Sequence, residues 1–339
     1  MDIALLLRWF LKNKRNFPWR ENKTPYAVWV SEVMLQQTQA CVVVEYFEKW
    51  MALFPSLEDL ALADIAKVLK AWEGLGYYSR AKRLHEGALH ILKVHQGNIP
   101  QDPELLAKVP GVGPYTLGAI LSFAFGKKIP AVDGNVVRVM TRLYGIDAYC
   151  EKAATKQLIY QKVLELLPEK KPELVSEGLI ELGACVCKKK PLCHKCPLKQ
   201  GCQAFAAGNP HMYPVKQKKT PTEKLFRCIN VCLYQNKILV KKPLEDSSLM
   251  GHLHQLPFTE NNAPLPLCFS LCQKIPFAKE YFTHTFTKYH VKCEPLVYKA
   301  DKEFFLEGYS WLTRQEIDQC TFSSGDRKIL SWIYAKSLL

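Results

Sequence analysis

The chain has 339 residues, of which 48% are hydrophobic and 23% are charged, and its formal net charge is +14. This length suffices for two domains with separate cores, and the composition is that of an ordinary globular protein. No uncharged apolar stretch is long enough to span a bilayer, which argues against a membrane-spanning helix. The positive charge suggests a polyanionic partner.

The N-terminal stretch "ALLLRWFLKNKR" (4–15) is interrupted by Arg8 and lacks a small-residue cleavage site. It therefore predicts an amphipathic first helix and not a signal peptide. The expected location is cytoplasmic (nucleoid-associated if bacterial), or nuclear in a cell that has a nucleus.

The stretch "SEVMLQQTQ" (31–39) contains an isolated carboxylate. Glu32 is the only formally charged side chain from Thr24 to Val44. A carboxylate in apolar surroundings needs a partner, a shifted proton affinity or a chemical task, and a buried structural pair is the alternative. Gln36 and Gln39 follow at helical spacing, so we expect them to share one helix face with Glu32.

The next segments predict a mostly helical region through residue 205. Apolar residues recur at three- and four-residue spacing over 57–72, 80–95 and 156–167. Within "WEGLGYYSRAKRL" (72–84), two glycines allow close backbone approach, and a tyrosine pair precedes three basic residues. This pattern suits stacking on nucleobases, while packing of the tyrosines against a neighbouring helix is the alternative.

Two further segments carry candidate site residues. In "VPGVGPYTLGAILSFAF" (109–125), Gly111 and Gly113 form a tight turn before a helix that begins near Pro114 or Tyr115. Such a turn exposes backbone N–H groups that suit a phosphate, although an ordinary helix–helix turn fits equally. In "IPAVDGNVVRVM" (129–140), Asp133 is expected to cap a helix. With Glu32 it would supply the two carboxylates that cleavage of a glycosidic bond requires.

Four of the 13 cysteines form a cluster. Gaps of five, two and five residues separate Cys187, Cys193, Cys196 and Cys202. The odd total and the missing secretory signal argue against disulfides, so the cluster predicts a metal site, with zinc and iron–sulfur both open. From Cys185 to Arg227 there are nine Lys and one Arg against one Glu, which suits contact with a phosphate backbone or a solvated linker.

The C-terminal third has a different composition. Gly, Pro and Lys predict a linker over 206–224, and 225–339 is expected to be an α+β domain. A hairpin is predicted around Gln235-Asn236, strands over 280–298, and a helix in the last residues.

Taken together in chain order, these motifs resemble those of the helix-hairpin-helix DNA glycosylase superfamily, and within it the adenine DNA glycosylases of the MutY type. The motifs are "PWR" (18–20), "TPYAVWVSEVMLQQTQ" (24–39), "WEGLGYYSRA" (72–81), "VPGVGPYTLGAI" (109–120), "VDGNVVRV" (132–139) and "ELGACVC" (181–187). The resemblance implies a mainly α N-terminal half (1–205) with a six-helix module and an iron–sulfur module. An α+β Nudix-like C-terminal domain (225–339) would follow the linker.

The resemblance also implies an activity, a cofactor and a partner. The activity is monofunctional base-excision repair, in which the N-glycosidic bond of adenine opposite 8-oxoguanine or guanine in duplex DNA is hydrolysed. The cofactor is a [4Fe–4S] cluster within segment 185–202, held by Cys187, Cys193, Cys196 and Cys202. The protein is expected to be a monomer without a membrane partner.

Individual residues match the family's functional positions. Glu32 matches the general acid, Asp133 the carboxylate that stabilises the electron-poor sugar, and Tyr115 and Asn135 the residues that orient these groups. Glu177 matches a residue that recognises the extruded adenine. The positions expected to contact DNA are Arg20, Gln37, Thr38, Leu75, Tyr77, Gly111, Gly113 and Thr287.

One position separates this chain from the endonuclease III type, and two features depart from the pattern of the family that it resembles. The endonuclease III type has a nucleophilic lysine where this chain has Tyr115, and a phenol cannot form a Schiff base. The first cysteine gap is five residues, against six in the family. The 8-oxoguanine-reading sequence Phe-Ser-His is here Phe286-Thr287-Lys288. An endonuclease III-like or mismatch thymine glycosylase and a non-catalytic zinc module are the alternatives.

Overall fold

The computed structural model describes residues 2–218, 221–244, 251–260, 269, 272–286 and 288–338. Two compact units form within them. The first comprises Met1–Leu62 and Arg83–Lys218, and the second comprises Ala63–Lys82 and Lys219–Leu339. Nothing in the sequence predicts that residues 63–82 join the C-terminal unit. Across the described ranges, every helix is too short or too polar to cross a membrane.

The first unit is helical, and short turns join most of its elements. In chain order these are α1 (Ile3–Asn13), α2 (Pro18–Glu21), α3 (Pro25–Leu35), α4 (Ala40–Leu53), α5 (Leu57–Leu62), α7 (Ser79–His95), which begins in the second unit, α8 (Pro103–Leu106), α9 (Pro114–Ala119), the π-helix η1 (Ile120–Ala124), α10 (Gly134–Leu143), α11 (Ala153–Leu166), α12 (Pro172–Cys185), the 3-10 helices η2 (Cys193–Lys195) and η3 (Lys199–Gly201), α13 (Gln203–Ala206) and the 3-10 helix η4 (Pro210–Met212).

The helices predicted at the N-terminus and over 80–95 and 156–167 are confirmed as α1, α7 and α11. The segment 57–72 is instead two helices, α5 and α6 (Ile65–Ala71). The break follows from Asp64, whose side chain accepts a hydrogen bond from the amide of Ala66 and so caps a new helix.

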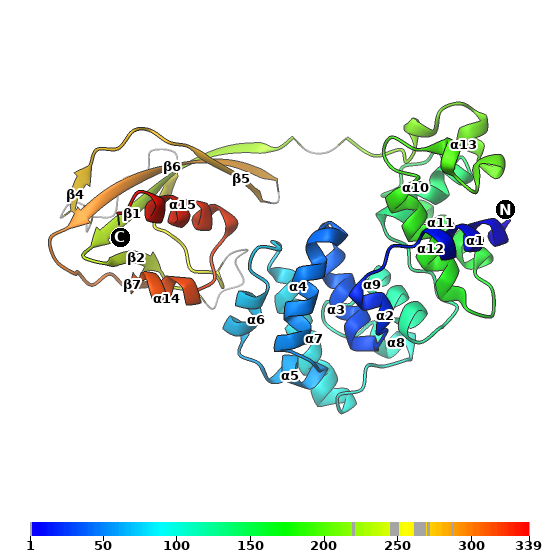
Figure 1. Ribbon diagram of the computed structural model, residues 1–339, viewed down its shortest axis with the longest axis horizontal. Helices are drawn as coiled ribbons and strands as arrows, with labels where there is room; N and C mark the ends of the chain where they lie inside the picture. Colours follow the sequence, from blue (N-terminus) through cyan, green and yellow to red (C-terminus); the bar gives the residue numbers. More distant parts are fainter. Residues whose placement is uncertain are drawn as a thin grey trace. The chain divides into compact units, whose positions relative to one another are not determined.

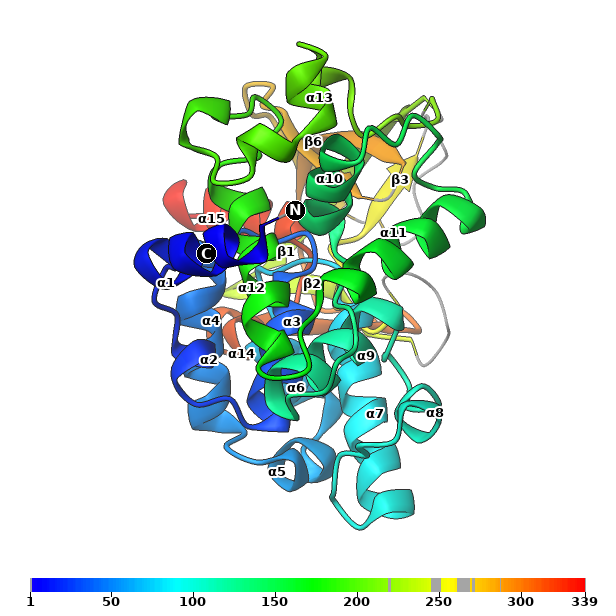
Figure 2. The ribbon, with the colours of Figure 1, turned by 90° about the vertical axis from the view of Figure 1, so that its right-hand side faces the viewer.

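Helix α12 lies between α1 and α10 (Figure 2). Apolar residues on α10 recur at Val136, Val139, Met140 and Leu143, and this stripe packs on α12 in a buried core. Burial of each such side chain contributes about 1.5–3 kcal/mol to folding. The packing fixes the N-terminal end of α10, where Asp133 lies.

The second unit is a mixed β-sheet with flanking helices. Its strands are β1 (Glu223–Tyr234), β2 (Lys237–Lys241), β3 (Phe258–Glu260), β4 (Cys272–Ile275), β5 (Phe282–Phe286), β6 (Tyr289–Ala300) and β7 (Tyr309–Thr313), and its further helices are α6, α14 (Arg314–Gln319) and α15 (Ser324–Ala335). The order is β4-β6-β1-β2-β7, with β3 beside β1 and β5 beside β6. The long β1–β6 pair is parallel. The predicted hairpin is confirmed, since Tyr234 pairs with Lys237 across the turn.

Successive side chains along β1 point alternately to the two faces of this sheet. Ile229, Val231 and Leu233 point into a core that they share with α14 and α15, and Figure 1 shows α15 lying across the sheet. Cys232 points to the opposite face, where it packs with Tyr298. The α+β character predicted for the C-terminal part is thereby confirmed as a mixed sheet with helices. The predicted C-terminal helix is α15.

Candidate active site

A cavity of about 1140 Å³ opens in the first unit, and most of the candidate site residues line it. Four of its lining residues carry ionisable or amide groups expected to take part in catalysis, namely Glu32, Tyr115, Asp133 and Asn135. The others expected from the sequence are Arg20, Gln37, Thr38, Gly111, Gly113 and Glu177. The cavity therefore gathers side chains from segments as far apart as α2 and α12.

Glu32 lies on α3, a helix with nine of its eleven residues buried, and only 6% of Glu32 is exposed. Its carboxylate accepts a short hydrogen bond from the hydroxyl of Tyr115, on the first turn of α9. Burial raises the pKa of Glu32 to about 7, and the nearby charges of Asp133 and Glu177 act in the same direction. The hydrogen bond from Tyr115 and the charge of Arg20 oppose this shift.

Asp133 is the N-cap of α10, as predicted. One carboxylate oxygen accepts hydrogen bonds from the amides of Asn135 (2.9 Å) and Val136 (2.7 Å), and the other from Asn135 Nδ2 (2.6 Å). Burial raises the pKa of Asp133, while these three donors and the charge of Arg138 oppose the rise. The two carboxylates thus differ in their surroundings, since Glu32 accepts from one phenol and Asp133 from three N–H groups.

Arg138 connects Asp133 to the cysteine-bearing segment. Its guanidinium donates to Asn135 Oδ1 (2.7 Å), to the carbonyl of Gly183 (2.8 Å) and to the carbonyl of Cys187 (2.7 Å). Asn135 therefore binds Asp133 and Arg138 at the same time. The sequence analysis missed Arg138, although its position one turn after Asn135 on the same helix was a usable signal.

A second group of charges lies on α12. Glu177 and Glu181 are buried and one helical turn apart. Lys23 Nζ lies 2.8 Å from Glu177 Oε2, and Arg20 reaches both carboxylates, at 3.8 Å to Glu177 and 2.8 Å to Glu181. Arg15 also pairs with Glu181. The sequence analysis missed Lys23, Glu181 and Arg15, because ion pairs between residues more than 150 positions apart have no local pattern.

The glycine turn before α9 has the expected form. Gly111 has φ +80°, and an added Cβ would lie 2.9 Å from the Cβ of Arg83, so a larger residue is excluded there on two grounds. Gly113 is the N-cap of α9, and Pro114 is its first residue. The helix predicted to begin near Pro114 is confirmed.

The segment after Glu32 departs from the prediction. Helix α3 ends at Leu35, so Gln36 and Gln39 do not continue the helix face of Glu32. The chain turns at Gln37, which has φ +61°, and α4 begins at Ala40. The prediction of a shared helix face was wrong because the turn interrupts the helical period. The turn nevertheless brings residues 36–39 to the cavity wall.

Three of the expected DNA contacts lie outside this cavity's unit or outside the described residues. Leu75 and Tyr77 belong to the second unit, where Leu75 is buried and Tyr77 is half exposed with φ +48°. Thr287 falls outside the described residues. Its neighbour Lys288 is described, and its Nζ lies 2.6 Å from Glu223 Oε1.

The four clustered cysteines follow α12: Cys193 begins η2, Cys196 comes directly after η2, and Cys202 comes directly after η3. No group of three or more His, Cys, Asp or Glu side chains in the described ranges is arranged to hold a metal ion. Cys187, Cys196 and Cys202 nevertheless pack against the same buried core. Burial is the largest cause that raises the pKa of Cys196 to about 11, and Cys187, Cys202 and Cys193 act in the same direction. All four are free of disulfides and partly buried.

Arg142 provides a test of whether this segment suits an anionic group. Only 2% of Arg142 is exposed, and its guanidinium donates to the carbonyl of Lys188 (2.6 Å) and to the Sγ of Cys187 (3.3 Å). Its Nε has no hydrogen-bond partner, and no carboxylate pairs with it among the described residues. A buried cation requires compensating negative charge, and thiolates bound to iron would supply it.

Comparison with known proteins shows which class of protein the helical unit resembles. A family model described as "HhH-GPD superfamily base excision DNA repair protein" matches residues 30–168. A thermostable thymine-DNA glycosylase of known structure aligns with a TM-score of 0.56 and 28% identity, over 60% of this chain and 95% of its own. The helical unit is similar to base-excision repair proteins of this superfamily.

The sequence relatives narrow the class. The adenine DNA glycosylase of Buchnera aphidicola (subsp. Schizaphis graminum) is 34% identical over 243 residues, which cover 71% of this chain and 70% of the relative. The chain belongs to the adenine DNA glycosylase family. The adenine DNA glycosylase of Homo sapiens is 43% identical over 209 residues, 59% of this chain, but the match spans only 38% of the human protein's length. Two mammalian relatives from rat and mouse are covered to about the same extent.

Proposed function

We propose that the protein is a monofunctional DNA glycosylase that hydrolyses the N-glycosidic bond of adenine paired with 8-oxoguanine or guanine in duplex DNA. One observation carries the proposal: Glu32 is buried, is hydrogen-bonded to Tyr115, and lines the same cavity as Asp133. This gives the cavity one carboxyl group that can hold a proton near neutral pH and a second, hydrogen-bonded carboxylate.

The first step is protonation of the base. The glycosidic bond is inaccessible inside the duplex, so the adenine must leave the base stack and enter the cavity. Protonated Glu32 then donates its proton to the adenine, at N7, and the base departs as a neutral molecule. A pKa of about 7 leaves a large fraction of Glu32 protonated at neutral pH.

The second step is stabilisation of the sugar. As the bond breaks, positive charge develops on the deoxyribose, and the carboxylate of Asp133 opposes it directly or through a transient covalent bond. Asn135 holds Asp133 in place through its 2.6 Å hydrogen bond. Addition of water to the sugar carbon, with loss of a proton, yields the abasic site.

Tyr115 favours hydrolysis without strand cleavage. Its phenol donates to Glu32, and burial raises the pKa of Tyr115 well above its ordinary value, so it remains a protonated donor. A phenol cannot form the Schiff base that precedes strand scission. We expect no covalent complex with DNA after borohydride treatment.

Recognition of the substrate is assigned to the rest of the cavity. Glu177 would bind the exposed edge of the adenine, with Arg20 and Lys23 holding its carboxylate. The amides exposed at Gly111 and Gly113 would bind phosphate, and the turn of Gln37 and Thr38 would contact the mispaired bases. Tyr77 with Leu75, on the loop after α6, would act as the wedge in the base stack.

A [4Fe–4S] cluster held by Cys187, Cys193, Cys196 and Cys202 would complete the helical part. The buried Arg142 beside Cys187 supports an anionic group at this position. The four cysteines would hold the cluster, which would supply a cross-link within segment 185–202. Its assignment to this chain is tested by iron analysis and by the broad visible absorbance that zinc proteins lack.

The second unit is proposed to read the base opposite the adenine, as a Nudix-like domain of a monomeric protein. Lys288 stands where the family has a histidine, and its pairing with Glu223 supports a role in shaping the strand ends of β1 and β6. We expect altered discrimination of 8-oxoguanine from guanine relative to the family.

The decisive experiment compares the unaltered protein with Glu32→Gln on three duplexes, containing A opposite 8-oxoguanine, A opposite G, and T opposite G. Alkaline cleavage after the reaction reveals abasic sites. We expect cleavage at adenine in the first two duplexes only, and none with Glu32→Gln, although that variant still binds DNA. Adenine release by Glu32→Gln at the normal rate would refute the assignment, and cleavage at T would indicate a mismatch thymine glycosylase.

A further inference from the structure

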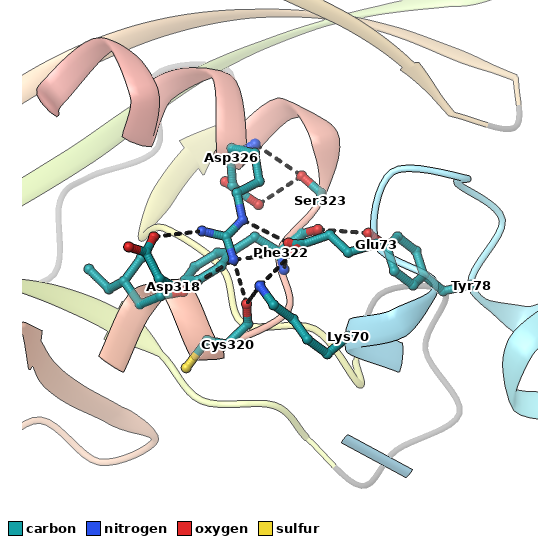
Figure 3. A network of polar contacts seen from close by, with 10 residues as sticks. Lys70, Glu73, Tyr78, Asp318, Cys320, Phe322, Ser323 and Asp326 are labelled. Atoms are coloured by element: carbon teal, nitrogen blue, oxygen red, sulfur yellow. Dashed lines mark hydrogen bonds and ion pairs between the residues drawn. The ribbon is translucent and has the colours of Figure 1, made fainter. Parts of the chain in front are cut away.

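Within the second unit, residues 63–82 carry Tyr77, and residues 219–339 are called here the C-terminal sheet unit. Glu73 ties the first of these segments to the other (Figure 3). The Glu73 carboxylate accepts hydrogen bonds from the backbone amide of Phe322 (2.9 Å) and from Arg327 Nε (2.7 Å), and Lys70 Nζ lies 2.6 Å away. Although burial acts in the opposite direction, Arg327 and Lys70 hold the pKa of Glu73 below its ordinary value. Charge-assisted hydrogen bonds of this kind are stronger than neutral ones.

Tyr78, five residues after Glu73, is also hydrogen-bonded to Phe322. The hydroxyl of Tyr78 donates to the carbonyl of Phe322 (2.9 Å), so the amide and the carbonyl of Phe322 bind Glu73 and Tyr78 respectively. The Phe322 side chain is fully buried, and its ring lies beneath the guanidinium group of Arg327. Lys70 adds a hydrogen bond to the carbonyl of Cys320 (3.0 Å).

The Tyr77 loop, residues 73–78, has an unusual backbone between these two attachments. Gly74, Gly76 and Tyr77 have φ values of 104°, 69° and 48°. A non-glycine residue in this region costs about 1–3 kcal/mol and persists only where its surroundings fix it. Half of the Tyr77 side chain is exposed, so burial of its ring contributes little to holding this conformation.

We propose that Glu73 and Tyr78 are positioning residues, through which the C-terminal sheet unit holds the Tyr77 loop in the shape required for base extrusion. The proposal rests on the proposed function, in which Tyr77 enters the base stack. A loop that is already ordered avoids the conformational entropy cost of ordering it on DNA, about 1–2 kcal/mol per residue. The C-terminal unit thereby assists adenine excision through the loop, in addition to any contact of its own with the opposite base.

Two variants and one matched control test the proposal. Glu73→Gln weakens the contact with Arg327, and Tyr78→Phe removes a single hydroxyl, which keeps the test possible even where Glu73→Gln fails to fold. Asp318→Asn is the control, because exposed Asp318 pairs with the NH1 of the same arginine (3.8 Å). The first readout is hydrogen–deuterium exchange of residues 73–78 in the free protein. We expect the exchange to be roughly tenfold faster in both variants and unchanged in the control.

The second readout is base extrusion. A duplex with 2-aminopurine beside an adenine opposite 8-oxoguanine is mixed with saturating protein, and the rise in fluorescence gives the extrusion rate. We expect a roughly tenfold slower rise in both variants, an unchanged rise in Asp318→Asn, and an unaltered pH dependence of excision. Unchanged exchange in both variants, faster exchange with a normal extrusion rate, or an equal effect in the control would each overturn the proposal. If the unaltered protein released no adenine, the proposed function would fail, and the exchange comparison would still decide whether the contact holds the loop.

Discussion

At the scale of single residues, Glu32 is a buried carboxyl group on α3 whose hydrogen-bond donor is the hydroxyl of Tyr115. Its isolation within 21 residues of chain predicts a buried carboxylate with a raised pKa, because burial in an apolar helix is a local property of α3. Lys23 and Glu181 were missed, because their partners come from α12 and from α2. The cap formed by Asp133 was predicted, since capping is local, whereas its link to Arg138 was not.

The pKa of Glu32 predicts the pH dependence of excision. The acid must be protonated, so the single-turnover rate at saturating protein should be nearly constant below pH 6 and should fall above a pKa of about 7. The fall should approach roughly tenfold per pH unit. The measurement is adenine release between pH 5 and 9, and a rate that still increases from pH 7 to 9 would contradict the assignment of Glu32 as the acid.

The same pKa predicts that Glu32→Gln stabilises the fold at alkaline pH. The folded-state pKa of about 7 lies above the ordinary value of 4.5, so the native protein binds more protons than the unfolded chain in this window. Stability is therefore lost as the pH rises from 4.5 through 7. Glutamine removes this cost, and the gain at pH 8 should be as much as about 3 kcal/mol. Thermal unfolding at pH 5 and pH 8 measures it, and a variant less stable than the parent at pH 8 would show that Glu32 is not destabilised by burial.

At the scale of elements, the site depends on how closely α10 approaches α12. Gly183 on α12 allows this approach, because a Cβ there would lie 2.6 Å from the Cβ of Asn135. The sequence motif "ELGACVC" contains this glycine, yet nothing in the motif indicates which helix it faces. The turn at Gln37 was missed for a related reason. The helical spacing of the side chains continues in the sequence through Gln37, but in the fold this residue has a positive φ and the helix has ended.

Gly183→Ala should accordingly disturb catalysis from outside the cavity. The added methyl group forces α10 away from α12 and displaces Asn135 together with Asp133, at a cost of about 1–3 kcal/mol in unfolding free energy. We expect slower adenine release with a smaller change in DNA affinity. Gly201→Ala is the matched control for stability, because no atom lies within 4 Å of its added Cβ. Equal unfolding free energies for the two variants would refute the packing argument.

At the scale of the whole molecule, charge and the division into units are the relevant features. The net charge of +14 and the exposed lysines at 188–190 indicate binding that is dominated by phosphate contacts. The composition favours a polyanionic partner, which stays a prediction, and it changes near residue 206. It could not predict that residues 63–82 join the C-terminal unit, because that grouping depends on contacts between distant segments.

Affinity for duplex DNA should therefore be strongly salt-dependent. If about six phosphates are neutralised, the Kd should rise about a thousandfold between 50 and 200 mM salt. Excision at saturating protein should change little over this range, because the buried site is only weakly screened. Fluorescence anisotropy with a labelled duplex provides the measurement, and an affinity independent of salt would argue against phosphate contacts.

The hydrogen bond between Phe322 and Glu73 joins residues 249 positions apart. During synthesis, residues 63–82 leave the ribosome long before β6, α14 and α15 exist. Their contacts with Phe322 can therefore form only after nearly the whole chain has been synthesised. Contacts of such large sequence separation form late and slow the folding of the element that needs them. A nascent or truncated chain would thus carry Glu32 and Asp133, the two carboxylates proposed to be catalytic, before its Tyr77 loop is held, and the proposed repair activity would be one of the last properties that the chain acquires.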